Sequence, residues 1–395
     1  MKKSKILALL LTLALAISLS IPVTAIGGKS YATPDSAMSE VRAIALHTPA
    51  RFAPTADWEN ITITKETPMY DLLGDLVAYC VDLRNAGTGE NAYVFVDARE
   101  NNYPILQYSP AAVSPYFDQT DRAIFATAGQ YYTDNGSAFV DLATGAEFDK
   151  QEVLAAVSAS AAKAGARTVA AEEDYSEVRQ AYITGEFAPT RATEVRLTGV
   201  PNLGQPSNLA MACVPTSMAM VLLKQYPGLL PVYSTVYDNI TTNTQLIADL
   251  YSRMGTSPDP WPNGGTKANR YVSAQGFLQD YGVDYSFAKF DWTKKYALDG
   301  NPYPGMTDNP FSVYKDEINE DRALIVMATN NNHTYISPGY PAGFECHAMA
   351  GMGYKDDGAN SKLIVHTTCV SDGAVYIPYT YAALGTGFAW FIVEP

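Results

Sequence analysis

A cysteine and a distant histidine are the residues of this chain best suited to act together in catalysis. Cys213 stands at the start of the run CVPTSMAMVLL, and His347 lies far downstream in CHAMAGMGY. A thiolate can attack a carbonyl carbon while a nearby imidazole takes and returns the proton. A cysteine and a histidine contributed by opposite parts of a fold are typical of thiol hydrolases.

The residues that follow Cys213 predict a helix that begins there. Apolar residues recur at helical spacing from Met218 to Leu223, and Pro215 is tolerated only in a first turn. Unpaired amides at a helix N-terminus favour a thiolate, so we expect a lowered pKa for Cys213. Gln205, upstream, is a candidate donor to the oxyanion of a tetrahedral intermediate.

Three motifs in segment 198–395 resemble the bacteriocin-processing-peptidase-like (C39-like) branch of the papain-like cysteine peptidases. VPNLGQ followed by CVPTSMAMVL is similar to Q-x7-C-G-P-T-S, HAMAGMGY to H-x5-G-Y, and LIVHTT to V-x-V-H-D-T. The resemblance implies a cysteine peptidase that acts on a peptide or protein substrate and needs no cofactor or metal. Its catalytic residues would be Cys213, His347, Gln205 and Thr367.

Two residues depart from the pattern of that branch. Val214 replaces a glycine and is expected to narrow the approach to the oxyanion site. Thr367 replaces the Asp or Asn that orients the histidine. A hydroxyl accepts a hydrogen bond from imidazole, but it does not stabilise imidazolium with a full charge. Asp372 and His366 are alternative partners, and a catalytically weak or inactive module that binds peptide or cell-envelope material is the alternative function.

The order of elements predicts an α+β fold. A helix carries the cysteine, a C-terminal antiparallel sheet carries the histidine, and a smaller α+β domain precedes both. The expected segments are a signal peptide (1–25), a flexible lead-in (26–65), an N-terminal domain (66–190), a linker (191–197) and the papain-like domain (198–395).

The N-terminal half resembles a streptopain-type pro-region and contains no catalytic constellation. We expect residues 26–190 to act as an inhibitory or chaperoning pro-region that is removed near Arg191, where the polar, Pro-bearing linker suits a protease cleft. A permanent accessory domain is the alternative.

The start of the chain predicts secretion from a bacterium. Three lysines, an apolar run from Ile6 to Leu19 and the small residues Val23-Thr24-Ala25 are typical of a cleaved signal peptide. We therefore expect an extracellular protein without stable membrane insertion, and a monomer. The net charge of −14 argues against nucleic acid and anionic membranes as partners.

The remaining cysteines and histidines leave two further possibilities. A zinc site of Cys346, His347, His366 and Cys369 is disfavoured, because adjacent strand residues point to opposite faces. With Cys213 reduced, Cys80, Cys346 and Cys369 allow at most one disulfide. In a regular hairpin, a Cys346–Cys369 pair and a His347–Thr367 pair exclude each other. His47 and His333 are expected to be incidental.

The sequence thus predicts peptide-bond hydrolysis by Cys213 and His347. Amidase or acyl-transfer chemistry on cell-wall peptides would use the same residues.

Overall fold

The structure of the chain is a computed structural model. The residues that it describes are 34–52, 58, 60–100, 102–155, 174–187, 193–230, 242–258, 266, 274, 286–291, 295–297, 310–329, 346–358, 361–369, 373–380 and 389–394.

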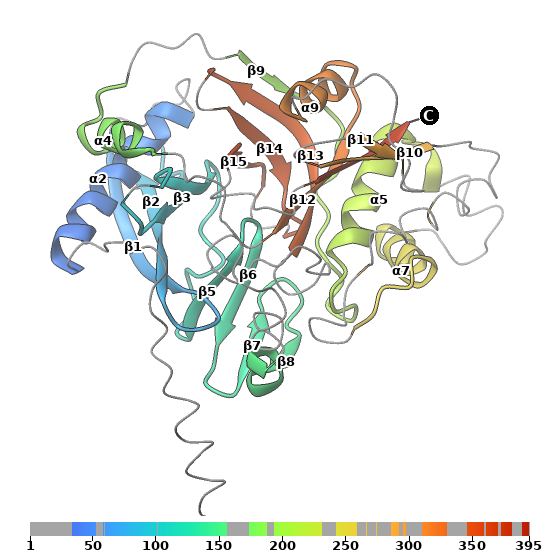
Figure 1. The fold of residues 1–395 in the computed structure, drawn as a ribbon, viewed down its shortest axis with the longest axis horizontal. Coiled ribbons are helices and arrows are strands. Elements are labelled where there is room, and N and C mark those ends of the chain that lie inside the picture. The colour runs from blue at the N-terminus through green and yellow to red at the C-terminus, as the bar shows by residue number, and fades with distance from the viewer. Residues whose placement is uncertain are drawn as a thin grey trace, which may run out of the picture. The chain divides into compact units, whose positions relative to one another are not determined.

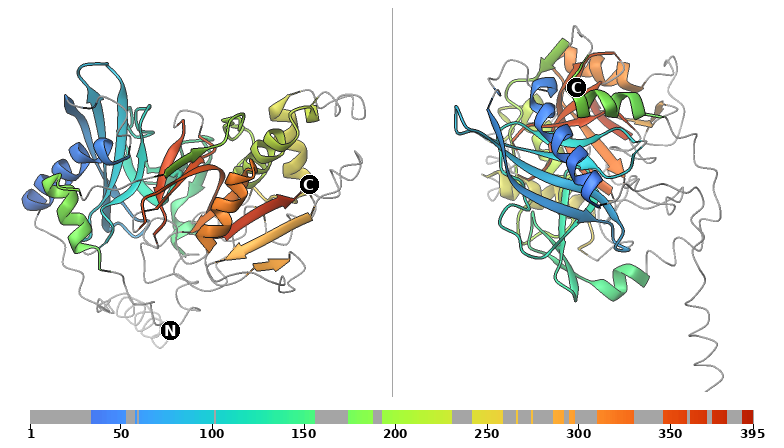
Figure 2. Two further views of the ribbon diagram at one scale, coloured as in Figure 1. Left: turned by 90° about the horizontal axis from the view of Figure 1, so that it is seen from above. Right: turned by 90° about the vertical axis from the view of Figure 1, so that its left-hand side faces the viewer.

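The N-terminal half is built on a sheet, with helices packed beside it. Its strands are β1 (Ile61–Tyr70), β2 (Leu76–Asn85), β3 (Asn91–Asp97), β4 (Ile105–Ser109), β5 (Arg122–Thr127), β6 (Gln130–Asp134), β7 (Ala138–Asp141) and β8 (Glu147–Asp149). Its helices are α2 (Pro34–Phe52) and α4 (Ser176–Thr184). Figure 2 shows α2 and α4 side by side, and α2 packs against the strands β1 to β3.

Helix α2 corrects the expectation of a flexible lead-in over 26–65. Its residues Val41, Ile44, Ala45 and Phe52 are buried in the main hydrophobic core. Their spacing of three, one and seven residues gives one apolar helical face, and packing of this face against the sheet beneath it supplies most of the helix's stability.

The C-terminal half contains the helices and strands that carry the candidate site. These are β9 (Thr193–Arg196), α5 (Cys213–Gln225), α7 (Asn243–Arg253), β10 (Ser286–Asp291), β11 (Lys295–Ala297), α9 (Pro310–Asn319), β12 (Leu324–Thr329), β13 (Cys346–Asp356), β14 (Lys362–His366), β15 (Val375–Pro378) and β16 (Ala389–Glu394). Helix α7 begins with a capping box between Thr242 and Gln245. The expected mixture of helices and strands is confirmed.

The strands of both halves form one continuous sheet. Their order is β11-β10-β16-β12-β13-β14-β15-β4-β3-β2-β1-β5-β6-β7-β8 (Figure 1). The halves join where Tyr376 of β15 pairs with Tyr108 of β4. The ring of Phe52, at the end of α2, packs edge-on against both tyrosines, with centroid distances of 5.2 Å to Tyr108 and 5.8 Å to Tyr376. The main core therefore runs through the junction.

Strand β9 occupies most of the predicted linker 191–197. Thr193 to Arg196 pair with β13, so this part of the chain belongs to the sheet. The close approach requires a glycine in β13, because a Cβ at Gly353 would lie 2.4 Å from the carbonyl oxygen of Val195. Arg191, the expected cleavage position, lies outside the described residues.

A buried group of charges holds the end of α2 on the C-terminal half. Arg51 pairs with Asp357 at 2.7 Å, and Lys362 donates to the same carboxylate at 3.0 Å. Lys355 of β13 donates to the carbonyl oxygen of Phe52 at 2.8 Å, where the negative end of the helix dipole favours a cation. Burial lowers the pKa of Lys362 to about 8, opposed by Asp357.

Candidate active site

Cys213 is the first residue of α5, as its position in the sequence predicts. Met211, at φ 60°, turns the chain into the helix, and the amide of Thr216 closes the first turn on the carbonyl of Ala212 at 2.9 Å. The helix then continues through a buried run from Val214 to Leu222. The helix N-terminus therefore presents the Cys213 sulfur together with unpaired backbone amides.

Val214 does not narrow the site in the way that we expected. Its side chain is 1% exposed and belongs to the main core. Its backbone amide still lowers the pKa of the Cys213 thiol.

His347 is fully buried near the start of β13, where it pairs with Ala328 of β12. Its Nε2 lies 2.6 Å from the carbonyl oxygen of Thr367. A carbonyl only accepts, so Nε2 carries the proton and donates it. Nδ1 is then the acceptor nitrogen, and it is buried without a hydrogen-bond partner among the described residues. The ring is thus in the tautomer in which Nδ1 can take a proton.

Helix α5 brings Cys213 to the residue that follows His347. The backbone amides of Ala348, Val214 and Cys213 itself face the sulfur closely enough to lower the pKa of the thiol. No hydrogen bond joins Cys213 to His347 in the described part of the chain. The predicted nucleophile and base are therefore adjacent through β13 but do not form an ion pair.

Thr367 accepts the hydrogen bond of His347 with its backbone carbonyl and not, as the sequence predicts, with its hydroxyl. Its hydroxyl accepts from the amide of Cys369 at 3.3 Å and leaves His347 to the carbonyl. A bulge between Gly351 and Gly353 sets the local register of β13 against β14 at Ala350 and His366. By strand alternation this register places Thr367 on the same face as His347. The side chain of Cys346 lies outside the described residues, so its disulfide stays an expectation.

The two alternative partners of His347 do not take that place in the described structure. His366 directs Nδ1 to the carbonyl oxygen of Gly373 at 3.1 Å, and burial lowers its pKa. Asp372 lies outside the described residues. No group of three or more potential metal ligands occurs among the residues that the structure describes.

Gln205 hydrogen-bonds Thr368, a neighbour of His347. Its backbone amide donates to the carbonyl oxygen of Thr368 at 3.0 Å, and its Nε2 donates to the Thr368 hydroxyl at 3.1 Å. That hydroxyl lies 3.4 Å from Nε2 of His347. Gln205 and His347 are thus linked through Thr368.

Burial decides the charge state of the candidate pair. It raises the pKa of Cys213 to about 11, against the opposing effect of the three amides, and the Asp141 carboxylate raises it further. Burial also lowers the pKa of His347 to about 4, opposed by the carbonyl of Thr367. The pair is therefore a neutral thiol and a neutral imidazole near pH 7, which corrects our expectation of a lowered thiol pKa. Desolvation outweighs the helix N-terminus here.

The N-terminal half supplies the atoms that cover His347. Gly129, in the turn between β5 and β6, lies so close that an added Cβ would be 3.0 Å from Cδ2 of His347 and 2.9 Å from Sδ of Met349. The amide of Gly129 donates to Oε1 of Gln107, at 2.9 Å. Nε2 of Gln107 donates to the hydroxyls of Tyr93 and Tyr131, so a buried network fixes the turn.

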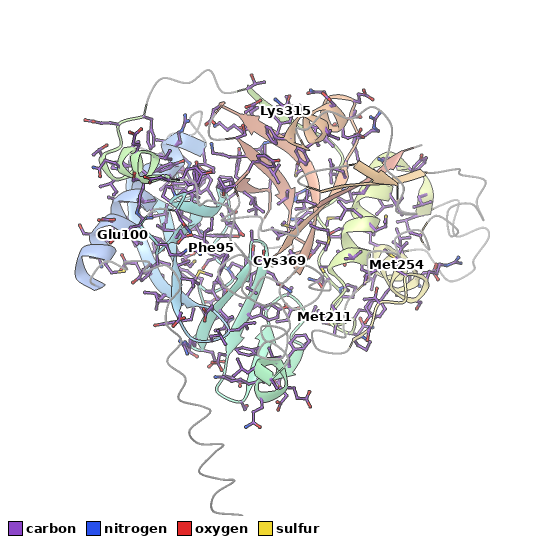
Figure 3. The ribbon with its side chains drawn as sticks, viewed as in Figure 1. Phe95, Glu100, Met211, Met254, Lys315 and Cys369 are labelled. Carbon is purple, nitrogen blue, oxygen red and sulfur yellow. The ribbon has the colours of Figure 1, made fainter. Side chains whose placement is uncertain are left out.

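Two residues near Cys213 and His347, Met211 and Cys369, pack into hydrophobic clusters formed by strands of the N-terminal half. Met211, labelled in Figure 3, packs with Phe139 and Phe148 of β7 and β8. Cys369, also labelled, packs against the cluster that contains Phe95. Sequence reasoning missed Gly129, Gln107 and Asp141, because nothing local relates them to Cys213 or His347.

Comparison with known proteins identifies the class of the C-terminal half. Residues 197–386 match the model of the Peptidase C39-like family. This segment contains the cysteine-bearing helix and the histidine-bearing strand described above, and it belongs to that family. Comparison with curated proteins gives no match. Among the described residues, no helix has the length and apolar character needed to cross a bilayer.

Proposed function

We propose that the protein is a secreted bacterial cysteine peptidase that hydrolyses peptide bonds. The observation that carries the proposal is the placement of Cys213 at a helix N-terminus beside Ala348, preceded by His347, whose Nδ1 has no hydrogen-bond partner among the described residues. Peptide or protein substrates fit this chemistry, which requires no cofactor.

In the proposed reaction, Nδ1 of His347 takes the proton of the Cys213 thiol. The sulfur attacks the scissile carbonyl carbon, and the carbonyl π electrons move to its oxygen. The amide of Cys213 and an N–H of Gln205 donate to that oxyanion. When the intermediate collapses, the C–N bond breaks, the amine takes the proton from Nδ1, and an acyl-enzyme remains. Water, deprotonated by the same nitrogen, then releases the acid and regenerates the thiol.

We also propose that residues 26–190 act as an inhibitory pro-region. Gly129 covers the ring of His347, and Asp141 raises the pKa of the thiol, so the N-terminal half favours the unreactive neutral pair. Its removal would bring water to the buried His347 and expose the half-buried Cys213 further, and both pKa values would move toward the thiolate and imidazolium forms.

The alternative is a catalytically silent module that binds peptide or cell-envelope material. The neutral charge state and the absence of a carboxylate or amide side chain bonded to His347 within the described residues favour it. In such a module the N-terminal half would stay in place and keep Cys213 and His347 covered.

The two functions are separated by incubating the purified full chain beside its Cys213→Ala variant. The peptidase predicts cleavage between about residues 185 and 198 in the wild type only, followed by labelling of Cys213 with an epoxide probe. A second sample of each is nicked with trypsin, for which Arg191 is a candidate site. Wild type that is nicked there, hydrolyses no casein and leaves Cys213 unlabelled would contradict the peptidase, and an intact chain with full activity would contradict the pro-region.

A further inference from the structure

Thr368 has a backbone conformation that its residue type disfavours. Its φ is 70°, and the other non-glycine residues with positive φ in the described part of the chain are Met211 and Asp321. For a β-branched residue this left-handed conformation is a true outlier, because Cβ approaches the following carbonyl. Thr368 is also fully buried. Such strain persists only where the surrounding structure imposes it, and it concentrates at functional sites.

The strained conformation directs two oxygens of Thr368 at one residue. Its carbonyl accepts from the backbone amide of Gln205 at 3.0 Å, and its hydroxyl accepts from Gln205 Nε2 at 3.1 Å. The same hydroxyl lies 3.4 Å from Nε2 of His347. A hydroxyl has two acceptor lone pairs, so it can face both N–H groups together.

A structural explanation of Thr368 is that the chain must only turn away from β14 after His366. Glycine makes such a turn without strain, and asparagine makes it at small cost. Neither explains a β-branched side chain whose hydroxyl stands between two N–H groups.

We propose that Thr368 is the positioning residue of His347. Together with the carbonyl of Thr367, its hydroxyl takes the place of the side-chain acceptor that orients the histidine. Two neutral oxygens then hold the Nε2–H, and Nδ1 stays the nitrogen that accepts the proton. Gln205 fixes this hydroxyl with one N–H and keeps its second for the oxyanion, so it connects the two ends of the site. The inference rests on the peptidase function proposed above.

The test uses the full chain and a readout that does not require activity. The protein has four histidines, so ¹⁵N-labelled imidazole resonances are few, and His347→Gln assigns the one of interest. Thr368→Val keeps the shape and removes the hydroxyl, whereas Thr368→Ser keeps the hydroxyl. We expect the valine variant to lose the single Nε2–H tautomer at His347 and the serine variant to retain it.

Self-processing gives the second readout. Loss of an outer hydrogen-bond partner costs metal-bound histidines about 10- to 100-fold, and we expect a similar fall in the cleavage rate for Thr368→Val, with recovery in Thr368→Ser. The melting temperature of Thr368→Gly should not fall below that of wild type, because the substitution relieves the backbone strain. Its self-cleavage rate should be as low as that of the valine variant. Asp321→Gly, which relieves a φ of 61° at an exposed position, is the matched control with unchanged processing.

Equal tautomer populations in the valine and serine variants would overturn the positioning role. This outcome differs from failure of the peptidase function, in which the wild type neither processes itself nor reacts at Cys213. In that case the imidazole resonances alone decide the role of Thr368.

Discussion

Gly129 of the N-terminal half lies in van der Waals contact range of the imidazole of His347, with φ +77° and no room for a side chain. An added Cβ would also lie 3.2 Å from Cβ of Thr367. A turn from one half of the chain thus covers the candidate base of the other. Access to Cys213 and His347 therefore depends on contacts that the N-terminal half provides.

Replacing Gly129 by alanine should uncover the site. The new methyl group meets Met349 and His347, so the turn or these side chains must shift, and water gains access to His347, the proposed base of Cys213. We expect iodoacetamide to alkylate Cys213 faster at pH 8. Gly136→Ala is the matched control, because Gly136 also has positive φ (+99°) but has open space around it. Each variant should lose about 1–2 kcal/mol from the left-handed backbone. Equal alkylation rates in both would contradict the covering role of the turn.

The alkylation rate of Cys213 in the intact chain should depend steeply on pH. Burial raises the thiol pKa to about 11, so the thiolate fraction grows about tenfold per pH unit between pH 7 and 10. Cys213→Ala gives the background from the other cysteines. Asp141→Asn removes the carboxylate that disfavours the thiolate and should shift the profile to lower pH. A plateau below pH 8 in the intact wild type would mean that a thiolate and imidazolium pair already exists.

His347 should make the protein less stable in mild acid. Burial lowers its folded pKa to about 4, whereas the unfolded chain takes up the proton near 6.5. The unfolded state therefore binds more protons between these values, and the free energy of unfolding falls as pH drops from 6.5 to 4. The loss is about 3 kcal/mol, taking one pKa unit as about 1.4 kcal/mol.

This effect is measured as the difference between wild type and His347→Gln in urea unfolding at several pH values. The variant is subtracted from wild type because Asp141 raises the free energy of unfolding as the pH falls over the same range. Burial raises the pKa of Asp141 to about 6, so the folded state binds its proton first. A difference that does not change between pH 7 and 4 would contradict the neutral, buried imidazole.

The charges at the end of α2 predict unequal effects of two substitutions. Asp357→Ala leaves Arg51 and Lys362 buried together without their shared carboxylate, and it should cost about 3–5 kcal/mol. Lys362→Met keeps the pair of Arg51 and Asp357 and replaces a buried ammonium by an apolar chain, so it should cost much less. Urea midpoints compare the two, and equal losses would mean that Asp357 does not hold the group together.

Thr367→Ala should alter stability slightly and reactivity hardly at all. The carbonyl that bonds His347 remains, and the lost hydroxyl accepts from the amide of Cys369, a bond worth about 1 kcal/mol. The alkylation profile of Cys213 should therefore stay that of wild type. A profile that shifts with Thr367→Ala would return the orienting role to the hydroxyl.

Local pattern was enough to predict the helix at Cys213 and the strand at His347. Pro215, the apolar spacing after it and the residue composition of HAMAGMGY all act within a few residues. The same reasoning failed for α2, whose apolar residues are well spaced but lie among Pro, Thr and Ala. That helix depends on the sheet beneath it, and its sequence does not show the sheet.

The sequence by itself determined which residues could perform thiol chemistry and which family the C-terminal half belongs to. Only the tertiary structure decided how they are oriented and charged. A backbone carbonyl such as that of Thr367 exists at every position, so no residue type marks the one that will meet a histidine. The pKa values of Cys213 and His347 depend on desolvation, and desolvation is set by distant segments, here Gly129 and Asp141, that fold over the site.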